Sequence, residues 1–385
     1  MGANILQALL PSPGHGFCRP FPALTPAGSG TYPRHTGFLF LTRVYVHGCS
    51  PCPQGQYGAV LLCTWTGSVA PVAVKVQPRT RAAAPGLRNE VAACRAVQGS
   101  PFHLQLLHDV STASLRCLVF AYAPGGDLFA VLQDQHALAP ATALFFAAEV
   151  AAGLEYMHAR HLIYRDVSLS NTLLDAAGHV LLCDMGSCAV VPPGLPLVAF
   201  ELVGTPEYMA PEMLTDEAGY GPAVDWWALG VLLYELAVGR PPFWGGSGCG
   251  GGGDLQSPPQ TLDAARMEKF RQICEEDPRF PPHGEGRAAD PLPPSLLALM
   301  RGLLHKDPRA RTGLAGFHAH PSIAELLGPW ERVAARELAS PLPPLSDSIA
   351  VDDAAAITAA SPGEQEAIES LLGAMARFAD EEQAQ

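Results

Sequence analysis

The chain has 385 residues, more than one small domain needs, and this length suits a two-lobed protein with extensions. Hydrophobic residues make up 48% of it, which is enough for a large core. Its 24 basic and 37 acidic residues give a net charge of −13, which argues against a nucleic-acid binder because such proteins carry a basic surface. The acidic balance fits attraction of basic peptides, but it is also ordinary for cytosolic proteins.

The ten cysteines lack the spacing of a disulfide framework, and several lie in apolar runs, so we expect a reducing compartment. Cys49 and Cys52 form one C-x-x-C pair without a second pair or a histidine cluster, which disfavours a zinc site. The longest apolar stretch, Ala228–Val238, is short and contains Glu235, so no membrane span is predicted. No lysine or arginine precedes Arg19, which disfavours a secretory signal, and a cytoplasmic protein is expected.

Composition and periodicity divide the chain into four predicted segments. They are a flexible leader rich in Pro, Gly and Ala, a small strand-rich lobe, a larger and mostly helical lobe, and a tail rich in Ala, Pro and acidic residues: 1–37, 38–123, 124–329 and 330–385. In the small lobe, strand-like content predicts strands at 38–46, 57–65, 71–76, 104–110 and 115–122, with a helix at 88–97. In the larger lobe we expect helices at 142–160, 224–238, 296–304 and 323–327, short strands at 172–174 and 180–182, and a Gly-rich insert at 245–253.

The segment 55–60 joins two predicted strands and contains Gly55, Tyr57 and Gly58. Glycines at such a place let backbone N–H groups approach a phosphate without a Cβ in the way. An ordinary hairpin turn explains the same residues, so the segment alone is a weak signal.

Lys75 ends the string Val-Ala-Val-Lys on a predicted strand. An unpaired buried ammonium is costly, so we expect Glu90 on the next helix to be its partner. Such a pair would hold the α- and β-phosphates of a nucleotide.

The strongest local signal is the string from Tyr164 to Asn171, which follows a predicted helix. Asp166 is predicted to accept the proton of a substrate hydroxyl, and Asn171 to bind a metal. Asp184 follows a predicted strand and precedes Met-Gly, a setting that suits Mg²⁺, which prefers oxygen ligands. Together with Lys75 and Glu90, these residues predict phosphoryl transfer.

From about residue 38 to 327 the chain resembles the eukaryotic protein kinases, in particular the AGC group and most of all the cyclic-nucleotide-dependent kinases. Two strings carry the finer resemblance, GTPEYMAPE at 204–212 and AVDWWALG at 223–230. The resemblance implies an α+β bilobal fold, with a five-stranded antiparallel sheet and one main helix in the small lobe. It also implies a Ser/Thr protein kinase that uses ATP and Mg²⁺, with ATP between the lobes.

The resemblance implies roles around the adenine as well. Phe120 is the expected gatekeeper, and the hinge runs from Ala121 to Ala123. Val60, Ala73 and Leu173 would enclose the adenine, while Asp127 would face the ribose or a substrate arginine. With Gly55, Tyr57, Gly58 and Lys75, these residues make up the predicted nucleotide site.

Further roles follow from the same resemblance. Glu212 would pair with Arg311, and Asp225 would brace the backbone of the catalytic loop. Glu235 would meet basic substrate residues, but Ser170 replaces an acid that often assists it. The expected partners are therefore protein substrates with a moderate preference for basic residues near the phosphorylation site. A regulatory subunit in trans is a further candidate partner.

Three departures from the family pattern matter. Pro53 stands at the first glycine position of the phosphate loop, unless Gly48 fills that role. Ser168 replaces a lysine that contacts the transferred phosphate, and losing a cation there could cost several kcal/mol in the transition state. Glu201 replaces the phosphorylatable Thr of the activation loop, and its carboxylate could pair with Arg165 and mimic part of a phosphate's charge.

The tail resembles its AGC counterpart in part. Residues 330–345 are similar to the start of that tail, whereas Val351 replaces an expected aromatic residue and the F-x-x-F ending is missing. A predicted helix at 364–378 would act as a weak substitute for that ending or would simply pack on the small lobe. Two alternatives to an active Ser/Thr kinase stay open. One is a nucleotide-binding pseudokinase that acts as a scaffold, and the other is a small-molecule kinase, against which the peptide-platform string at 204–212 argues.

Overall fold

The computed structural model describes most of the two predicted lobes, namely residues 41–47, 59–65, 71–78, 84–111, 115–216, 218–243, 262–280 and 291–342. The predicted leader, residues 55–58 of the phosphate loop, the Gly-rich insert and the predicted helix 364–378 lie outside the described residues. The chain forms two compact units. The smaller unit comprises 1–98, 104–124 and 345–385, and the larger unit comprises 99–103 and 125–344.

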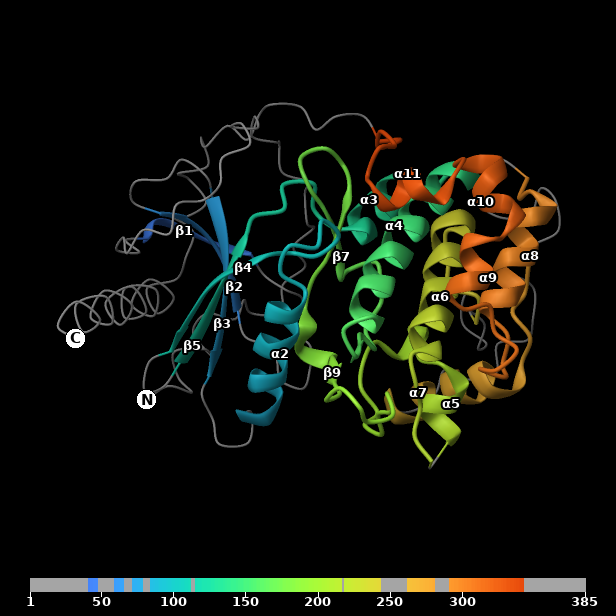
Figure 1. The fold of residues 1–385 in the computed structure, drawn as a ribbon, viewed down its shortest axis with the longest axis horizontal. Helices are drawn as coiled ribbons and strands as arrows, with labels where there is room; N and C mark the ends of the chain where they lie inside the picture. Colours follow the sequence, from blue (N-terminus) through green and yellow to red (C-terminus); the bar gives the residue numbers. More distant parts are fainter. Residues whose placement is uncertain are drawn as a thin grey trace. The chain divides into compact units, whose positions relative to one another are not determined.

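The smaller unit is built on one five-stranded sheet, in which β1 to β3 are blue and β4 and β5 are teal in Figure 1. Its strands are β1 Leu41–His47, β2 Ala59–Trp65, β3 Pro71–Pro78, β4 Leu106–Ser111 and β5 Leu115–Ala121. All neighbours pair antiparallel in the order β1-β2-β3-β5-β4. This confirms the predicted sheet, with β5 inserted between β3 and β4.

Strand β3 shows how the sequence pattern becomes a two-faced strand. Val72, Val74 and Val76 alternate along it and are almost fully buried. The residues between them point to the other face because successive side chains alternate across a strand. That second face carries Lys75 and Gln77, which are also buried, so β3 is covered on both sides.

Helix α2 spans Ala84–Ala96, whereas the sequence predicted 88–97. Its inner side chains Val91, Ala93 and Cys94 are buried. The helix therefore begins four residues earlier than the apolar pattern indicates, because its first turn has no apolar stripe to mark it.

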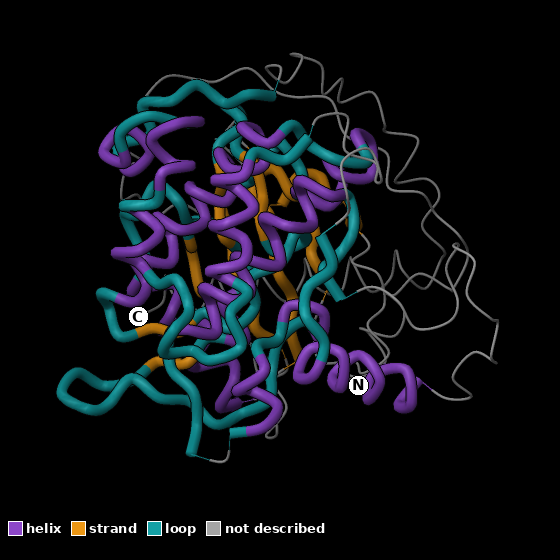
Figure 2. Tube along the Cα trace, turned by 90° about the vertical axis from the view of Figure 1, so that its right-hand side faces the viewer, coloured by secondary structure: helices purple, strands orange, loops and turns teal. Residues whose placement is uncertain are grey.

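The larger unit is mostly helical, with helices purple and strands orange in Figure 2. Its helices are α3 Leu128–Gln135, α4 Pro140–His158, α5 Pro211–Thr215, α6 Ala223–Val238, α7 Leu262–Glu275, α8 Pro294–Leu303, α9 Leu314–His318, α10 Pro321–Leu326 and α11 Trp330–Ala334. Its short strands are β6 Leu162–Ile163, β7 Thr172–Leu174, β8 Val180–Leu182 and β9 Ala189–Val190. Strand β6 pairs with β9, and β7 with β8, both antiparallel.

Helices α4 and α6 pack against each other and form the centre of this unit. Both are buried on almost every side, with Phe146 and Leu154 of α4 and Trp227 and Tyr234 of α6 at most 1% exposed. Helix α6 ends at Gly239, which has a φ of 83° and donates its N–H to the Glu235 carbonyl at 2.8 Å. A glycine in the left-handed region at this position is a common way to end a helix.

The segment after α11 connects distant parts of the larger unit. Arg336 donates to the Pro101 carbonyl at 2.8 Å and to Asp175 Oδ2 at 2.8 Å. Nearby, a Cβ on Gly178, whose φ is 80°, would lie 2.5 Å from Ser340 Oγ. The start of the tail thus lies against the turn between β7 and β8.

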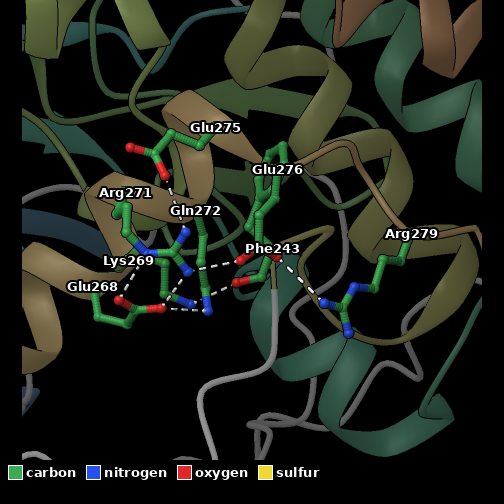
Figure 3. A network of polar contacts seen from close by, with 8 residues as sticks. All are labelled: Phe243, Glu268, Lys269, Arg271, Gln272, Glu275, Glu276 and Arg279. Atoms are coloured by element: carbon green, nitrogen blue, oxygen red, sulfur yellow. Dashed lines mark hydrogen bonds and ion pairs between the residues drawn. The ribbon is translucent and has the colours of Figure 1, made fainter.

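Helix α7 carries a network of exposed charges, drawn in Figure 3. Arg271 pairs there with Glu268, Glu275 and Glu276 at 2.7 to 3.1 Å. Lys269 Nζ connects this network to the segment after α6, because it donates to the Phe243 carbonyl at 2.8 Å. Exposed pairs of this kind add little to stability. Within the described residues, no helix combines the length and apolar character needed to cross a bilayer.

Candidate active site

The predicted pair between Lys75 and Glu90 is confirmed within the smaller unit. Lys75 Nζ lies 2.7 Å from Glu90 Oε1, and both side chains are less than 10% exposed. Gln77 adds a contact that the sequence did not predict, because its Nε2 donates to Glu90 Oε2 at 2.9 Å. Both oxygens of the buried carboxylate are therefore held from β3.

The strand register gathers the predicted nucleotide-contacting residues of the smaller unit. Val60 pairs with Lys75, and Ala73 pairs with Phe120. Paired residues of antiparallel strands share a face, and so do residues two apart on one strand. Val60, Ala73, Lys75 and Phe120 thus lie on one face of the sheet, as an adenine and phosphate site requires. Phe120 itself is 9% exposed.

In the larger unit, residues 164–171 form a loop between β6 and β7, and Asp225 holds the start of this loop. Its carboxylate accepts the N–H of Tyr164 at 2.9 Å and that of Arg165 at 2.7 Å. His158 Nε2 lies 2.7 Å from the same carboxylate, which is fully buried. The predicted brace is confirmed, and it fixes Arg165 with a φ of 69°, a strained value for a residue with a Cβ.

Asp166 receives two hydrogen bonds from Thr205. The N–H donates to Asp166 Oδ1 at 3.0 Å and the hydroxyl at 2.7 Å. This approach depends on Gly204, whose φ is 101° and where a Cβ would lie 2.3 Å from the Arg165 carbonyl oxygen. The contact of Thr205 with Asp166 was not predicted from the sequence, although the preceding glycine could have indicated a close approach of two backbones.

Asn171 and Asp184 come together at one end of the β7–β8 hairpin. The ladder pairs Thr172 with Leu182, and Cys183 N–H donates to the Asn171 carbonyl at 3.0 Å. Asn171 Nδ2 donates to the Asp166 carbonyl at 3.0 Å. Because the amide nitrogen is bound there, the amide oxygen of Asn171 points away from the Asp166 carbonyl. Asp184 has a φ of 48° and accepts from Gly186 N–H at 3.2 Å.

The electrostatics of this cluster suit a cation. Burial raises the pKa of Asp166, and the neighbouring Asp184 carboxylate raises it further, while the hydrogen bonds from Thr205 act in the opposite direction. A divalent ion bound beside the two carboxylates would offset their mutual repulsion. Mg²⁺ is commonly held by one or two protein oxygens plus substrate phosphates, so Asn171 and Asp184 fit it.

Ser168 supplies no cation, and its side chain is turned into the loop. It is 5% exposed, its Oγ accepts from Asn171 N–H at 3.3 Å, and its carbonyl accepts from Thr172 Oγ1 at 2.8 Å. Ser168 therefore shapes the turn that presents Asn171.

Arg165 links three parts of the larger unit. Its Nε donates to the Ser187 carbonyl at 2.6 Å, and its NH1 donates to Glu201 Oε2 at 2.7 Å and to Tyr220 Oη at 3.2 Å. The Tyr220 hydroxyl also donates to the Glu201 carbonyl. The hydrogen bond from Arg165 lowers the pKa of Glu201. The predicted pairing of Glu201 with Arg165 is confirmed.

Two carboxylates predicted to face substrate have partners in the larger unit. Glu235 accepts from the Tyr208 hydroxyl, and burial raises its pKa. Asp127 caps α3 by accepting from Ala130 N–H at 2.7 Å. Leu173 lies in β7 and bridges to Asp127.

The five predicted catalytic residues fall into two sets. Lys75 and Glu90 meet in the smaller unit, and Asp166, Asn171 and Asp184 meet in the larger one. Ala121 ends β5, and Ala123 is 9% exposed. Gly55, Tyr57 and Gly58 lie outside the described residues.

Such a fold, with this order of residues, defines a protein kinase domain. A comparison with known families matches residues 52–323 to the protein kinase domain, and the chain belongs to that family.

Curated relatives narrow the placement. RAC-beta serine/threonine-protein kinase B of Xenopus laevis is 38% identical over 250 residues, which cover 63% of this chain and 45% of that protein. The RAC-beta serine/threonine-protein kinase of Homo sapiens is 34% identical over 298 residues, which cover 76% of this chain and 56% of that protein. Serine/threonine-protein kinase Sgk2 of Rattus norvegicus is 36% identical over 265 residues, which cover 68% of this chain and 64% of that protein.

The chain spans about half the length of the RAC-beta relatives it matches. These relatives support the predicted likeness to the AGC group. They do not show the finer likeness to the cyclic-nucleotide-dependent kinases.

Proposed function

We propose that this protein is a Ser/Thr protein kinase that transfers the γ-phosphate of ATP to hydroxyl groups of protein substrates. The observation that carries the proposal is the cluster in which Asp166 is held by Thr205 and lies beside Asn171 and Asp184. Such a cluster orients a hydroxyl and holds a cation, which are the main needs of phosphoryl transfer.

Each residue has a task that its environment supports. Asp166 would orient the substrate hydroxyl and accept its proton. Lys75, held by Glu90, would bind the α- and β-phosphates, and Asn171 and Asp184 would hold Mg²⁺. When bound, Mg²⁺ offsets charge on the phosphates. The adenine would contact Val60, Ala73, Phe120, Ala121, Ala123 and Leu173.

The substrates are proposed to carry basic residues near the phosphorylation site. Glu235 and Asp127 are the candidate carboxylates of the larger unit, but each also holds a neighbour of its own chain. A competing internal partner weakens attraction for a substrate arginine, so the preference should be moderate. Equal turnover of basic and neutral peptides would rule the preference out.

The function is tested by measuring phosphate transfer from ATP with Mg²⁺ to a Ser peptide with flanking arginines. We expect transfer by the unaltered chain and loss of about a thousandfold or more in Asp166→Ala, because the positioned base is removed. ATP binding should persist in the variant. Transfer that is equal in both proteins would refute the assignment of Asp166.

Ser168 favours a second candidate function, a nucleotide-binding pseudokinase that acts as a scaffold or allosteric partner. Its buried side chain leaves this loop position without a cation for the transferred phosphate. ATP binding without detectable transfer, in protein with the same fold, would select this alternative.

We further propose that the kinase works without phosphorylation of its activation segment, because Glu201 already pairs with Arg165. In Glu201→Ala we expect turnover to fall roughly tenfold, since a charge-assisted hydrogen bond to a buried arginine is lost while Glu201 itself is largely exposed. Turnover is to be measured on protein shown by mass spectrometry to carry no phosphate.

Two variants make this prediction specific. Glu201→Gln keeps a hydrogen-bond acceptor without the charge, so its turnover should lie between that of the unaltered protein and that of Glu201→Ala. Glu337→Ala removes an exposed glutamate elsewhere in the larger unit and should leave turnover unchanged. The proposal fails if Glu201→Ala turns over like the unaltered protein.

The remaining assignments rest on sequence and are proposals as well. We propose a cytoplasmic location, protein substrates, and a regulatory subunit in trans as a second class of partner. The segment boundaries stay predictions from composition and periodicity, and they are 1–37, 38–123, 124–329 and 330–385. The likeness to cyclic-nucleotide-dependent kinases stays a prediction from the strings at 204–212 and 223–230.

A further inference from the structure

Gln77 contacts the carboxylate on which the Lys75 pair depends. Its Nε2 donates to Glu90 Oε2 at 2.9 Å, while Lys75 Nζ binds Oε1 at 2.7 Å. Gln77 is 6% exposed and Glu90 is 2% exposed. One amide and one ammonium, two residues apart on β3, therefore share a buried carboxylate of α2.

Packing alone does not account for an amide at this position. Gln77 Oε1 is buried and has no hydrogen-bond partner within the part of the chain that the structure describes. Leaving such an oxygen unpaired costs about 1–3 kcal/mol, and a leucine of similar size would avoid that cost. What the amide provides, and leucine could not, is the hydrogen bond to Glu90.

Lys75 and Gln77 differ in what else they can bind. An ammonium on a long, flexible stem can turn toward phosphate oxygens and loosen its hold on Glu90. The neutral amide has no attraction of this kind for a phosphate, and its shorter side chain stands on a paired strand. Its bond to Glu90 is thus independent of the nucleotide.

We propose that Gln77 is a positioning residue that keeps Glu90, and with it α2, in place whether or not Lys75 engages phosphate. This inference rests on the proposed kinase function. Without Gln77, the arrangement in which Glu90 meets Lys75 would be populated for a smaller fraction of the time. Apparent ATP affinity falls by that fraction, whereas bound ATP restores the arrangement.

The first test is Gln77→Met, which keeps the volume and removes the amide. We expect the KM for ATP to rise about tenfold, kcat to change less than about twofold, and the KM for the peptide to stay the same. Amide hydrogen exchange of residues 84–96, measured without nucleotide, should become faster. A purely structural defect would instead lower the amount of active protein and leave the KM for ATP unchanged.

A second variant tests the same contact through its pH dependence. Gln77→Glu places a second carboxyl group against Glu90. Among the described charged groups nearby, Lys75 of β3 binds Glu90, Arg116 of β5 pairs with Gln77 in the strand register and donates to Asp109 of β4, and Arg95 of α2 also contacts Asp109. Two adjacent carboxylates share a proton at low pH and repel each other once both ionise. We expect the KM for ATP of this variant to rise between pH 6 and pH 8.5, unlike that of Gln77→Met.

The matched control is Gln98→Met. Gln98 Nε2 donates to the Leu106 carbonyl at 2.6 Å, so this variant also removes an amide hydrogen bond from the smaller unit but does not touch Glu90. It should leave the KM for ATP unchanged. The same KM for ATP in Gln77→Met as in the control would overturn the proposal, even if exchange at 84–96 were faster. Unchanged exchange would overturn it as well.

The outcome stays readable if the kinase function fails. Should the unaltered protein transfer no phosphate, the dissociation constant for ATP replaces KM in each comparison. A roughly tenfold weaker ATP affinity with faster exchange in Gln77→Met would then support the positioning role, although the protein is no kinase.

Discussion

Replacing Arg311 by methionine is expected to lower the free energy of unfolding of the larger unit by about 3–5 kcal/mol. The change removes one member of a buried ion pair and leaves Glu212 behind, 7% exposed. An uncompensated buried carboxylate must either pay for its lost hydration or take up a proton. The check is denaturant unfolding followed by far-UV circular dichroism.

The size of the effect follows from how fully Arg311 is used. Its two terminal nitrogens bind the two Glu212 oxygens at 2.5 and 2.9 Å. Its remaining N–H groups donate to the carbonyls of Ala223, His305 and Lys306 at 2.8, 3.0 and 3.2 Å. All five guanidinium donors thus have acceptors, which neither lysine nor methionine can reproduce.

Arg309→Met is the matched control, because Arg309 lies two residues away in the same loop and is exposed. It should change the unfolding free energy by less than about 0.5 kcal/mol. A second variant, Glu212→Leu combined with Arg311→Met, removes both charges and should be less destabilised than Arg311→Met alone. Equal destabilisation by Arg309→Met and Arg311→Met would contradict the role given to the buried pair.

The two long helices of the larger unit could be predicted from the sequence because they are buried on most sides and are therefore apolar over most of their length. Helices α4 and α6 were expected at 142–160 and 224–238, and they span Pro140–His158 and Ala223–Val238. Strands β7 and β8 have the expected bounds, since a short strand-like triplet on each side of the turn at Gly178 marks a hairpin.

Other elements leave little trace in the sequence. Helix α7 was not predicted, because the polar Gln272 lies on its buried side next to Ile273 while the apolar Met267 is exposed, so no clear apolar stripe marks the helix. Helix α3 was missed too, since a polar turn and a proline-containing stretch surround its short sequence. Strands β6 and β9 have two residues each, which is too short for a periodic signal.

The candidate site shows the same division. The candidate catalytic residues could be predicted from their order along the chain, and the contacts of Glu90, Glu201 and Asp225 are confirmed. Contacts made by residues that belong to no recognised motif could not be predicted. Gln77 follows Lys75 in the alternation of a solvated strand face, and its contact with Glu90 appears once α2 covers that face.

Acid should destabilise the larger unit through His103. Its imidazole is fully buried, and its Nδ1 lies 2.7 Å from Ser100 Oγ. Burial lowers the pKa of His103 from 6.5 to about 3, and the nearby charge of Arg160 acts in the same direction. Between these two pKa values, His103 is therefore mostly protonated in the unfolded chain and mostly neutral in the folded chain.

The sign and size of the effect follow from this difference. The contribution of His103 is fully present above pH 6.5 and is lost as the pH falls toward 3, because protonation pulls the equilibrium to the unfolded state. With 1.36 kcal/mol for each pH unit, the loss between pH 7 and pH 4 amounts to about 3 kcal/mol. In His103→Phe, the stability difference between pH 7 and pH 4 should shrink by about this amount.

Unfolding free energies at pH 4, 5, 6 and 7 for both proteins test this prediction, whatever the variant costs at pH 7. Carboxylates that titrate in the same range contribute equally to the two proteins, so the difference between the curves isolates His103. His305→Gln is the control, because it removes an exposed histidine from the same unit. Parallel curves for His103→Phe and the unaltered protein would show that His103 accepts its proton while folded.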